Sequence, residues 1–151
     1  MLDIRVLGSD VEEETLALLA ALPCLHDEPH WTQAQLRDAC MGSEQVLGLF
    51  VKGKAVGYII GAQVLDQADI HTILVAVDWR AQGLAKQLLQ AMLARLKQQG
   101  ATQVFLEVRQ GNLAAQGLYA GYGFSATGQR INYYANRDGS RENAIIMSAK
   151  V

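Results

Sequence analysis

The sequence predicts an α/β (α+β) fold, with a mixed central sheet of about seven strands flanked by helices. Segments rich in β-branched and aromatic residues alternate along the chain with segments whose apolar residues recur at helical spacing. The strongest helical segment lies between two predicted strands, so it should form a right-handed crossover that makes those strands parallel. The chain has 151 residues and no repeat, linker or low-complexity tract, so we expect a single domain over residues 1–151.

Six elements are expected in the first half of the chain. In order, they are a strand at Leu2–Val6, helices at Val11–Leu22 and Gln33–Met41, and strands at Gln45–Val51, Ala55–Leu65 and Asp69–Val75. Ser9 or Asp10 can cap the first helix, and Thr32 can cap the second, because short polar side chains accept hydrogen bonds from free helical N–H groups. Pro23 and Gly42 mark where these helices stop.

Five elements are expected in the second half. They are the helix Gln82–Gln99, the strand Gln103–Arg109, a short helix that Asn112 caps and that runs through Tyr122, and the strands Phe124–Tyr134 and Ala144–Val151. In the long helix, Leu84, Leu88, Met92 and Leu96 line one face, and Gly100 suits the position after its end. Residues 135–143 are expected to form a polar loop between the last two strands.

Composition excludes several classes of partner. The formal net charge is -2 and there is no basic run, so we expect no direct nucleic-acid binding. The apolar runs are too short to span a bilayer, and the first five residues do not resemble a secretory signal. Cys24 and Cys40 have no metal-ligand spacing, so we expect no metal and a reduced, cytoplasmic protein.

A strand-to-helix turn at residues 77–86 is the first candidate site. The strand Ile73-Leu74-Val75 leads into Arg80-Ala81-Gln82-Gly83-Leu84-Ala85-Lys86. Free N–H groups at the start of a helix bind anions, and Gly83 removes a Cβ that would keep a phosphate away from the backbone. Arg80 and Lys86 add positive charge. The alternative is a tight turn before a core helix. The pattern resembles the acyl-coenzyme-A pyrophosphate loop of the GNAT acetyltransferases.

A second candidate site follows at residues 105–124. Glu107 stands among apolar strand residues, where an unpaired carboxylate is costly. It is either the partner of Arg109, two residues along the same strand face, or a general base. Tyr119 is either a core tyrosine or the proton donor to a leaving thiolate. Asn112 is sufficient as a helix cap, and it is also a candidate contact for a ligand.

The string Leu-Glu-Val-Arg-x-x-Asn-x-x-Ala-x-x-Leu-Tyr-x-x-x-Gly-Phe at residues 106–124 resembles the RimI family of GNAT enzymes. The segments at residues 132–134, 138–139 and 142–147 resemble the ending of that family, and Trp31-Thr32 resembles its second helix start. These enzymes acetylate the N-terminal alanine of a small-subunit ribosomal protein. Ala85 stands where glycine is commoner in the family.

The resemblance implies acetyl-CoA as cosubstrate and a role for each matching residue. Glu107 would accept a proton and Tyr119 would donate one. The coenzyme would contact Ile73, Leu74, Val75, Ala81, Gln82, Gly83, Leu84, Ala85, Lys86 and Asn112. The acceptor, a protein N-terminus, would contact Trp31, Tyr133 and Tyr134, and acidic residues (Asp27, Glu28 and Glu142) would suit a basic peptide.

Other functions stay open from the sequence. The acceptor is either an N-terminal α-amine or a lysine or small amine, and the loop Leu25–Trp31 is expected to help choose it. A third possibility is a coenzyme-A-binding regulatory module without catalysis. His71, on the strand before the turn, is an alternative base to Glu107.

Overall fold

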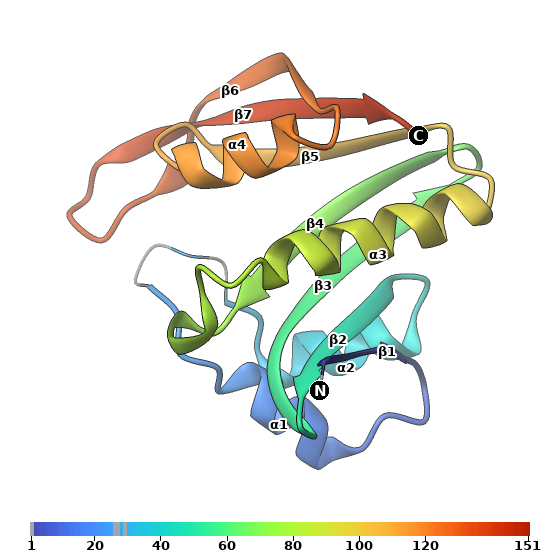
Figure 1. Ribbon diagram of the computed structural model, residues 1–151. Helices are drawn as coiled ribbons and strands as arrows, with labels where there is room; N and C mark the ends of the chain where they lie inside the picture. Colours follow the sequence, from blue (N-terminus) through green and yellow to red (C-terminus); the bar gives the residue numbers. More distant parts are fainter. Residues whose placement is uncertain (1, 26–27, 29) are drawn as a thin grey trace. The chain divides into compact units, whose positions relative to one another are not determined.

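The computed structural model describes residues 2–25, 28 and 30–151, and its elements follow the predicted order (Figure 1). They are β1 (Leu2–Leu7), α1 (Glu13–Ala20), α2 (Gln33–Met41), β2 (Gln45–Val51), β3 (Lys54–Val64), β4 (Gln67–Val75), the short 3-10 helix η1 (Val77–Trp79), α3 (Leu84–Gln98), β5 (Gln103–Arg109), α4 (Leu113–Ala120), β6 (Ser125–Ala135) and β7 (Arg141–Lys150). Only η1 has no counterpart in the sequence prediction.

The strands form one mixed sheet of seven, in the order β1-β2-β3-β4-β5-β7-β6, which confirms the predicted fold class. The β1–β2, β2–β3, β5–β7 and β6–β7 pairs are antiparallel. β4 and β5 are parallel, with Gln67–Ile70 paired to Gln103–Leu106, as expected for strands joined by the α3 crossover. That ladder ends at Ile70, so the last part of β4, which includes Ile73–Val75, lies beyond it.

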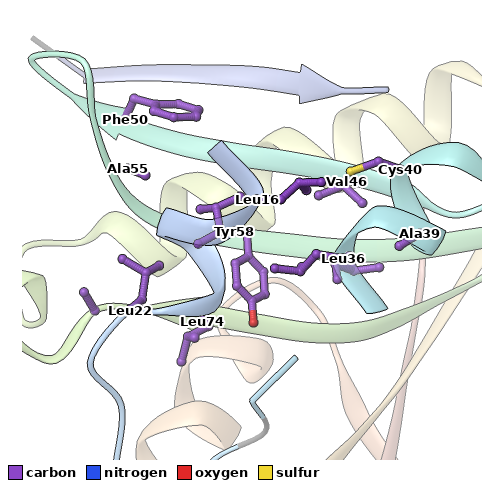
Figure 2. Packing of buried hydrophobic residues seen from close by; sticks show 13 residues of the cluster. Leu16, Leu22, Leu36, Ala39, Cys40, Val46, Phe50, Ala55, Tyr58 and Leu74 are labelled. Atoms are coloured by element: carbon purple, nitrogen blue, oxygen red, sulfur yellow. The ribbon is translucent and has the colours of Figure 1, made fainter. Parts of the chain in front are cut away.

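By internal contacts the chain divides into two compact units. Unit 1 comprises Met1–Ala62 and His71–Arg95, and unit 2 comprises Gln63–Ile70 and Leu96–Val151. The core of unit 1 collects buried apolar side chains from α1, α2, β2, β3 and β4 around Tyr58 (Figure 2). Tyr58 is 0% exposed, and its hydroxyl points away from β3. Burial raises the pKa of Tyr58 to about 12, against the lowering effect of the Trp31 backbone.

The sequence predicted the N-terminal cap of α2 correctly but not that of α1. Thr32 caps α2 as predicted: its hydroxyl accepts from the Gln35 N–H, and the Gln35 side chain accepts from the Thr32 N–H. The predicted caps of α1 were wrong, because Glu12 occupies the N-cap position and makes no side-chain cap. Within the described part of the chain, no helix is long and apolar enough to cross a membrane.

Unit 2 contains the antiparallel ladder of β5, β7 and β6. β7 begins at Arg141 rather than at Ala144, because Arg141 and Glu142 pair with Ala135 and Tyr134 of β6. The loop between these strands is therefore shorter than predicted. α4 ends at Ala120, before the predicted Tyr122.

Gly57 explains how β3 packs closely against the end of β4 in unit 1. A Cβ at Gly57 would lie 2.6 Å from the Leu74 carbonyl oxygen, closer than van der Waals contact allows. The Ala76 N–H donates to the Val56 carbonyl at 2.8 Å immediately beside this point. Glycine at residue 57 therefore lets the backbone approach the segment that leads into the turn.

Candidate active site

The turn before α3, in unit 1, has the backbone of an anion site. Ala81 (φ 61°) and Gly83 (φ 76°) are both left-handed, and the Gly83 carbonyl accepts the first α3 hydrogen bond, from Gln87 at 3.2 Å. The N–H groups of the first helical turn therefore have no partner within the helix. A Cβ built on Gly83 would meet nothing within 4 Å, so the space beside it is open. Alternating backbone conformations of this kind form a concave group of N–H donors.

Three residues at the end of β4, Ile73–Val75, were expected to contact the coenzyme, and their side chains are buried to different extents. Leu74 and Val75 are buried, and Leu74 belongs to the core cluster around Tyr58. Ile73 is partly buried. Because the side chains of Leu74 and Val75 face the core, pairing of a ligand with this segment would have to use backbone groups.

The two basic residues of the turn differ. Lys86 is exposed beside the turn. Arg80 does not supply a free charge as expected, because Nη1 and Nη2 donate to the two carboxylate oxygens of Glu28 at 2.7 and 2.6 Å. Its Nε donates to the Val75 carbonyl at 3.0 Å. The positive charge of Arg80 is therefore balanced within unit 1.

Glu107, in unit 2, pairs with an arginine that the sequence did not indicate. The Nε of Arg130 on β6 donates to Oε1 of Glu107 at 2.6 Å, and this hydrogen bond is the main cause of the raised pKa of Arg130. The expected alternative, a pair with Arg109, was wrong. Arg109 instead donates to Asn136 at 2.8 Å and to Glu142 at 3.4 Å. Among the described residues, none donates a hydrogen bond to Oε2 of Glu107.

A bulge in β6 brings Tyr133 and Tyr134 together. From Arg130 to Tyr134, β6 spans only the two steps from Ala144 to Glu142 on β7, and Asn132 is left-handed at φ 53°. Neighbouring residues of a regular strand point to opposite faces, but here the two tyrosine rings meet edge to face at 5.1 Å. The Arg109 guanidinium lies 4.4 Å over the Tyr134 ring and fixes it by a cation–π contact.

The turn between β5 and α4 is held by three side chains. Asn112 caps α4 as predicted, with Oδ1 accepting from the Ala115 N–H at 3.1 Å. The Gln116 amide donates to the Arg109 and Gln110 carbonyls at 3.1 and 2.8 Å. Glu142 accepts from the Gly111 N–H at 2.6 Å. α4 therefore starts in a fixed position beside the end of β5.

This placement fixes Tyr119, which lies one helical turn beyond Ala115. Its ring packs against Phe124, with centroids 5.9 Å apart. Burial raises the pKa of Tyr119 to about 12, and Tyr134 adds to the shift. The core and donor interpretations are thus compatible, because a packed phenol keeps its proton at neutral pH.

His71 and Trp31 have structural partners in unit 1. His71 Nδ1 lies 2.6 Å from Glu44 Oε2, and Trp31 packs against the core cluster. Asp27, expected to attract a basic peptide, lies outside the described residues. The other two acids of that expectation, Glu28 and Glu142, are engaged within the chain. No group of three His, Cys, Asp or Glu side chains among the described residues could hold a metal ion.

The sequence prediction missed the residues that hold the site in place: Arg130, Gln116 and the internal role of Glu142. Gln116 gave a weak signal, being polar inside the otherwise apolar pattern of a short helix. The other two gave none, because their partners lie 23 and 31 residues away in the chain.

Comparison with known proteins places these features in a family. The sequence profile of the acetyltransferase (GNAT) family matches residues 13–124, which include the turn, Glu107 and Tyr119. The ribosomal protein bS18-alanine N-acetyltransferase of Haemophilus ducreyi is 43% identical over 93 residues, 62% of this chain and 64% of that protein. Its Escherichia coli K12 counterpart is 40% identical over 99 residues, 66% of each.

These alignments span just under two thirds of the relatives' own length. The crystal structure of the ribosomal-protein-S18-alanine N-acetyltransferase from Escherichia coli matches with a TM-score of 0.87 and 30% identity, over 100% of this chain and 94% of that chain. Ard1 from Thermoplasma volcanium matches with a TM-score of 0.79, 28% identity, and 99% and 97% coverage. The profile match and the shared fold together establish that this chain belongs to the GNAT family of acetyltransferases.

Proposed function

We propose that this chain is a cytoplasmic, single-domain enzyme that transfers the acetyl group of acetyl-CoA to the N-terminal alanine of a small-subunit ribosomal protein. The observation that carries the proposal is that β5 and α4, both in unit 2, carry a carboxylate (Glu107) and a protonated phenol (Tyr119). The relatives named as bS18-alanine N-acetyltransferases support the choice of acceptor.

Acetyl-CoA supplies the thioester that the reaction consumes. In the proposal, the N–H groups of residues 81–86 bind its pyrophosphate, with Lys86 adding charge, and the backbone of Ile73–Val75 pairs with its pantetheine arm. Asn112 contacts the coenzyme through its amide nitrogen, because its Oδ1 already caps α4. A backbone N–H polarises the thioester oxygen, a donor worth about 3 kcal/mol at comparable sites.

Glu107 removes the proton that the attacking amine loses. An α-amine with a pKa near ~8 is neutral for about a tenth of the time at pH 7, whereas a lysine amine near ~10.4 is neutral for only about 0.04%. A carboxylate base is therefore better matched to an N-terminus than to a lysine. Arg130 engages Oε1, and this leaves Oε2 to accept the proton directly or through a water.

Tyr119 donates a hydrogen bond to the departing sulfur. Its pKa of about 12 keeps the phenol protonated at neutral pH. A free thiol has a pKa near ~8.5, so complete transfer to the thiolate would be uphill by about 5 kcal/mol. The proton therefore moves only as charge develops on the sulfur, and bulk water can return it to Tyr119 after the thiol leaves.

The acceptor lies against Trp31, Tyr133 and Tyr134 in this proposal. The two tyrosine rings meet edge to face, and the Arg109 guanidinium covers the Tyr134 ring. A slot with aromatic walls favours a small first side chain such as alanine. An apolar slot discriminates by only ~1–3 kcal/mol per methylene, so serine- or glycine-started peptides should react more slowly rather than not at all.

The function is tested by the choice of acceptor. We expect a basic peptide that starts with free alanine to be acetylated faster than its N-terminally blocked copy containing lysine, and faster than polyamines. The measurement is the initial rate of thiol release, with mass spectrometry to locate the acetyl group. Faster reaction of the blocked peptide or a polyamine would replace the N-terminal assignment by the lysine or small-amine one. No thiol release above the hydrolysis background with any acceptor would favour a regulatory coenzyme-binding module.

Replacement of Gly83 by glutamate tests the coenzyme turn. We expect Gly83→Glu to weaken acetyl-CoA binding at least 10-fold, because it adds a negative side chain at the proposed pyrophosphate position and strains a residue at φ 76°. Gly53→Glu is the control, since Gly53 has a similar φ of 79° in the turn between β2 and β3. Isothermal titration calorimetry on folded protein decides, and equal affinity in the two variants contradicts the site.

Replacement of Glu107 by glutamine tests the base. We expect Glu107→Gln to lower kcat by about 10²–10⁴ with little change in coenzyme affinity, because the amide keeps the shape but cannot accept a proton at neutral pH. Arg130→Gln removes the ion pair and keeps the base, so it should lower kcat far less. Equal losses in both variants would mean that Glu107 acts only by holding Arg130. If Glu107→Gln keeps its activity, His71 becomes the next candidate.

Replacement of Tyr119 by phenylalanine tests the donor. The variant keeps the packing against Phe124, so we expect an unchanged melting temperature and a fall in kcat of about 10²-fold. Because the pKa of Tyr119 lies at about 12, the wild-type kcat should not fall between pH 8 and about pH 10 through loss of this proton. Normal turnover with reduced stability would leave Tyr119 only its core role.

A further inference from the structure

Hydrogen bonds join the connection between α1 and α2 to the turn after β4 at two points, both within unit 1. The Val77 N–H donates to the Pro23 carbonyl at 3.0 Å. Five residues farther along the connection, the Glu28 carboxylate accepts a bidentate pair of hydrogen bonds from the Arg80 guanidinium. These contacts join segments that are about 50 residues apart in the chain, and nothing local in either segment requires them.

Each side chain of the Arg80–Glu28 pair makes a further hydrogen bond to the backbone. Its Nε donates to the Val75 carbonyl at the end of β4, and Glu28 Oε1 accepts from the Leu25 N–H at 2.5 Å. Arg80 and Glu28 are 31% and 26% exposed, so water screens their attraction only in part. Two parallel, charge-assisted hydrogen bonds fix orientation as well as distance, which a single lysine contact does not.

Arg80 also lies next to the proposed coenzyme site. The left-handed Ala81 follows it directly, and Gly83 and α3 come next. On its other side, the connection leads to Trp31, which packs against the core cluster that contains Tyr58. One side chain thus links the turn proposed to bind acetyl-CoA with the segment proposed to contact the acceptor.

We propose that Arg80 and Glu28 form a positioning pair that couples acceptor binding to the coenzyme turn. Building on the proposed function, the pair holds the described residues of the connection (21–25, 28 and 30–32) in an acceptor-ready position when acetyl-CoA orders residues 81–86. Coupling between sites is reciprocal, so bound coenzyme improves acceptor binding and bound acceptor improves coenzyme binding by the same factor.

The competing role for Arg80 is that of a cation for the pyrophosphate. The salt bridge to Glu28 argues against that role, because the negative charge of Glu28 neutralises the positive charge that Arg80 would offer to the pyrophosphate. The two roles predict different results for Glu28→Gln. Loss of a positioning pair weakens acceptor binding and leaves coenzyme affinity unchanged, whereas release of a phosphate-binding arginine tightens coenzyme binding.

The experiment compares Arg80→Gln, Arg80→Lys and Glu28→Gln with wild type, using acetyl-CoA and an alanine-started basic peptide. We expect all three variants to raise the peptide KM by about 5- to 30-fold, while kcat and the acetyl-CoA Kd measured without peptide stay within about twofold. Arg80→Lys should raise the peptide KM as much as Arg80→Gln does, because lysine keeps the charge but cannot form the bidentate contact. Arg37→Gln, which breaks the 2.6 Å Arg37–Glu13 pair between α1 and α2, is the control and should change KM by less than twofold.

Hydrogen exchange of residues 21–32 gives a readout independent of turnover. Acetyl-CoA should slow the amide exchange of this segment in wild type and in Arg37→Gln. In the three pair variants, acetyl-CoA should slow it less or not at all. Without coenzyme, the three pair variants should exchange faster than wild type in this segment.

Three results would overturn the proposal. They are a weaker acetyl-CoA Kd in Arg80→Gln together with a tighter one in Glu28→Gln, an unchanged peptide KM in all pair variants, and unchanged exchange of residues 21–32. If wild-type protein neither binds acetyl-CoA nor acetylates the peptide, the proposed function fails. The exchange of the unliganded variants still decides in that case whether the pair holds the connection.

Discussion

The backbone that leaves β4 at Val75 has to change direction and start α3, and unit 1 is organised around this requirement. Hydrogen bonds to β3, to the connection between α1 and α2, and to the end of β4 itself hold Ala76, Val77 and the Arg80 side chain. These contacts fix the path of the backbone from Val75 to Arg80 before a ligand arrives. Binding then has to order only the residues that follow, up to the start of α3.

Unit 2 uses the same principle with side chains in place of backbone contacts. Gln116 and Glu142 hold the turn between β5 and α4, and this sets the position of Tyr119 on α4 relative to β5. Arginines then hold the groups on β5 and β6: Arg130 meets the Glu107 carboxylate, and Arg109 covers Tyr134. Glu107 and Glu142 are each compensated by a guanidinium, which offsets part of the cost of removing a charge from water.

The fold and much of the candidate site could be predicted from sequence, because their signals are local. Apolar periodicity located every helix and strand except η1, and three elements, among them Gln45–Val51, matched at both ends. The caps at Thr32 and Asn112 were correct because a cap bonds within its own first turn. The bulge in β6 escaped prediction, since a change of register depends on the partner strand.

The sequence by itself determined the order of elements, the parallel pairing across α3, and the residue types at both candidate sites. The tertiary structure alone decided which charges meet. Arg109 is the nearest basic residue to Glu107 on its strand, yet Arg130 from β6 holds that carboxylate, and Glu28 reaches Arg80 across 52 residues. The physical reason is that hydrogen-bonded periodicity is set by neighbours in the chain, whereas an ion pair is set by distance in space. Only the folded chain brings its distant segments within that distance.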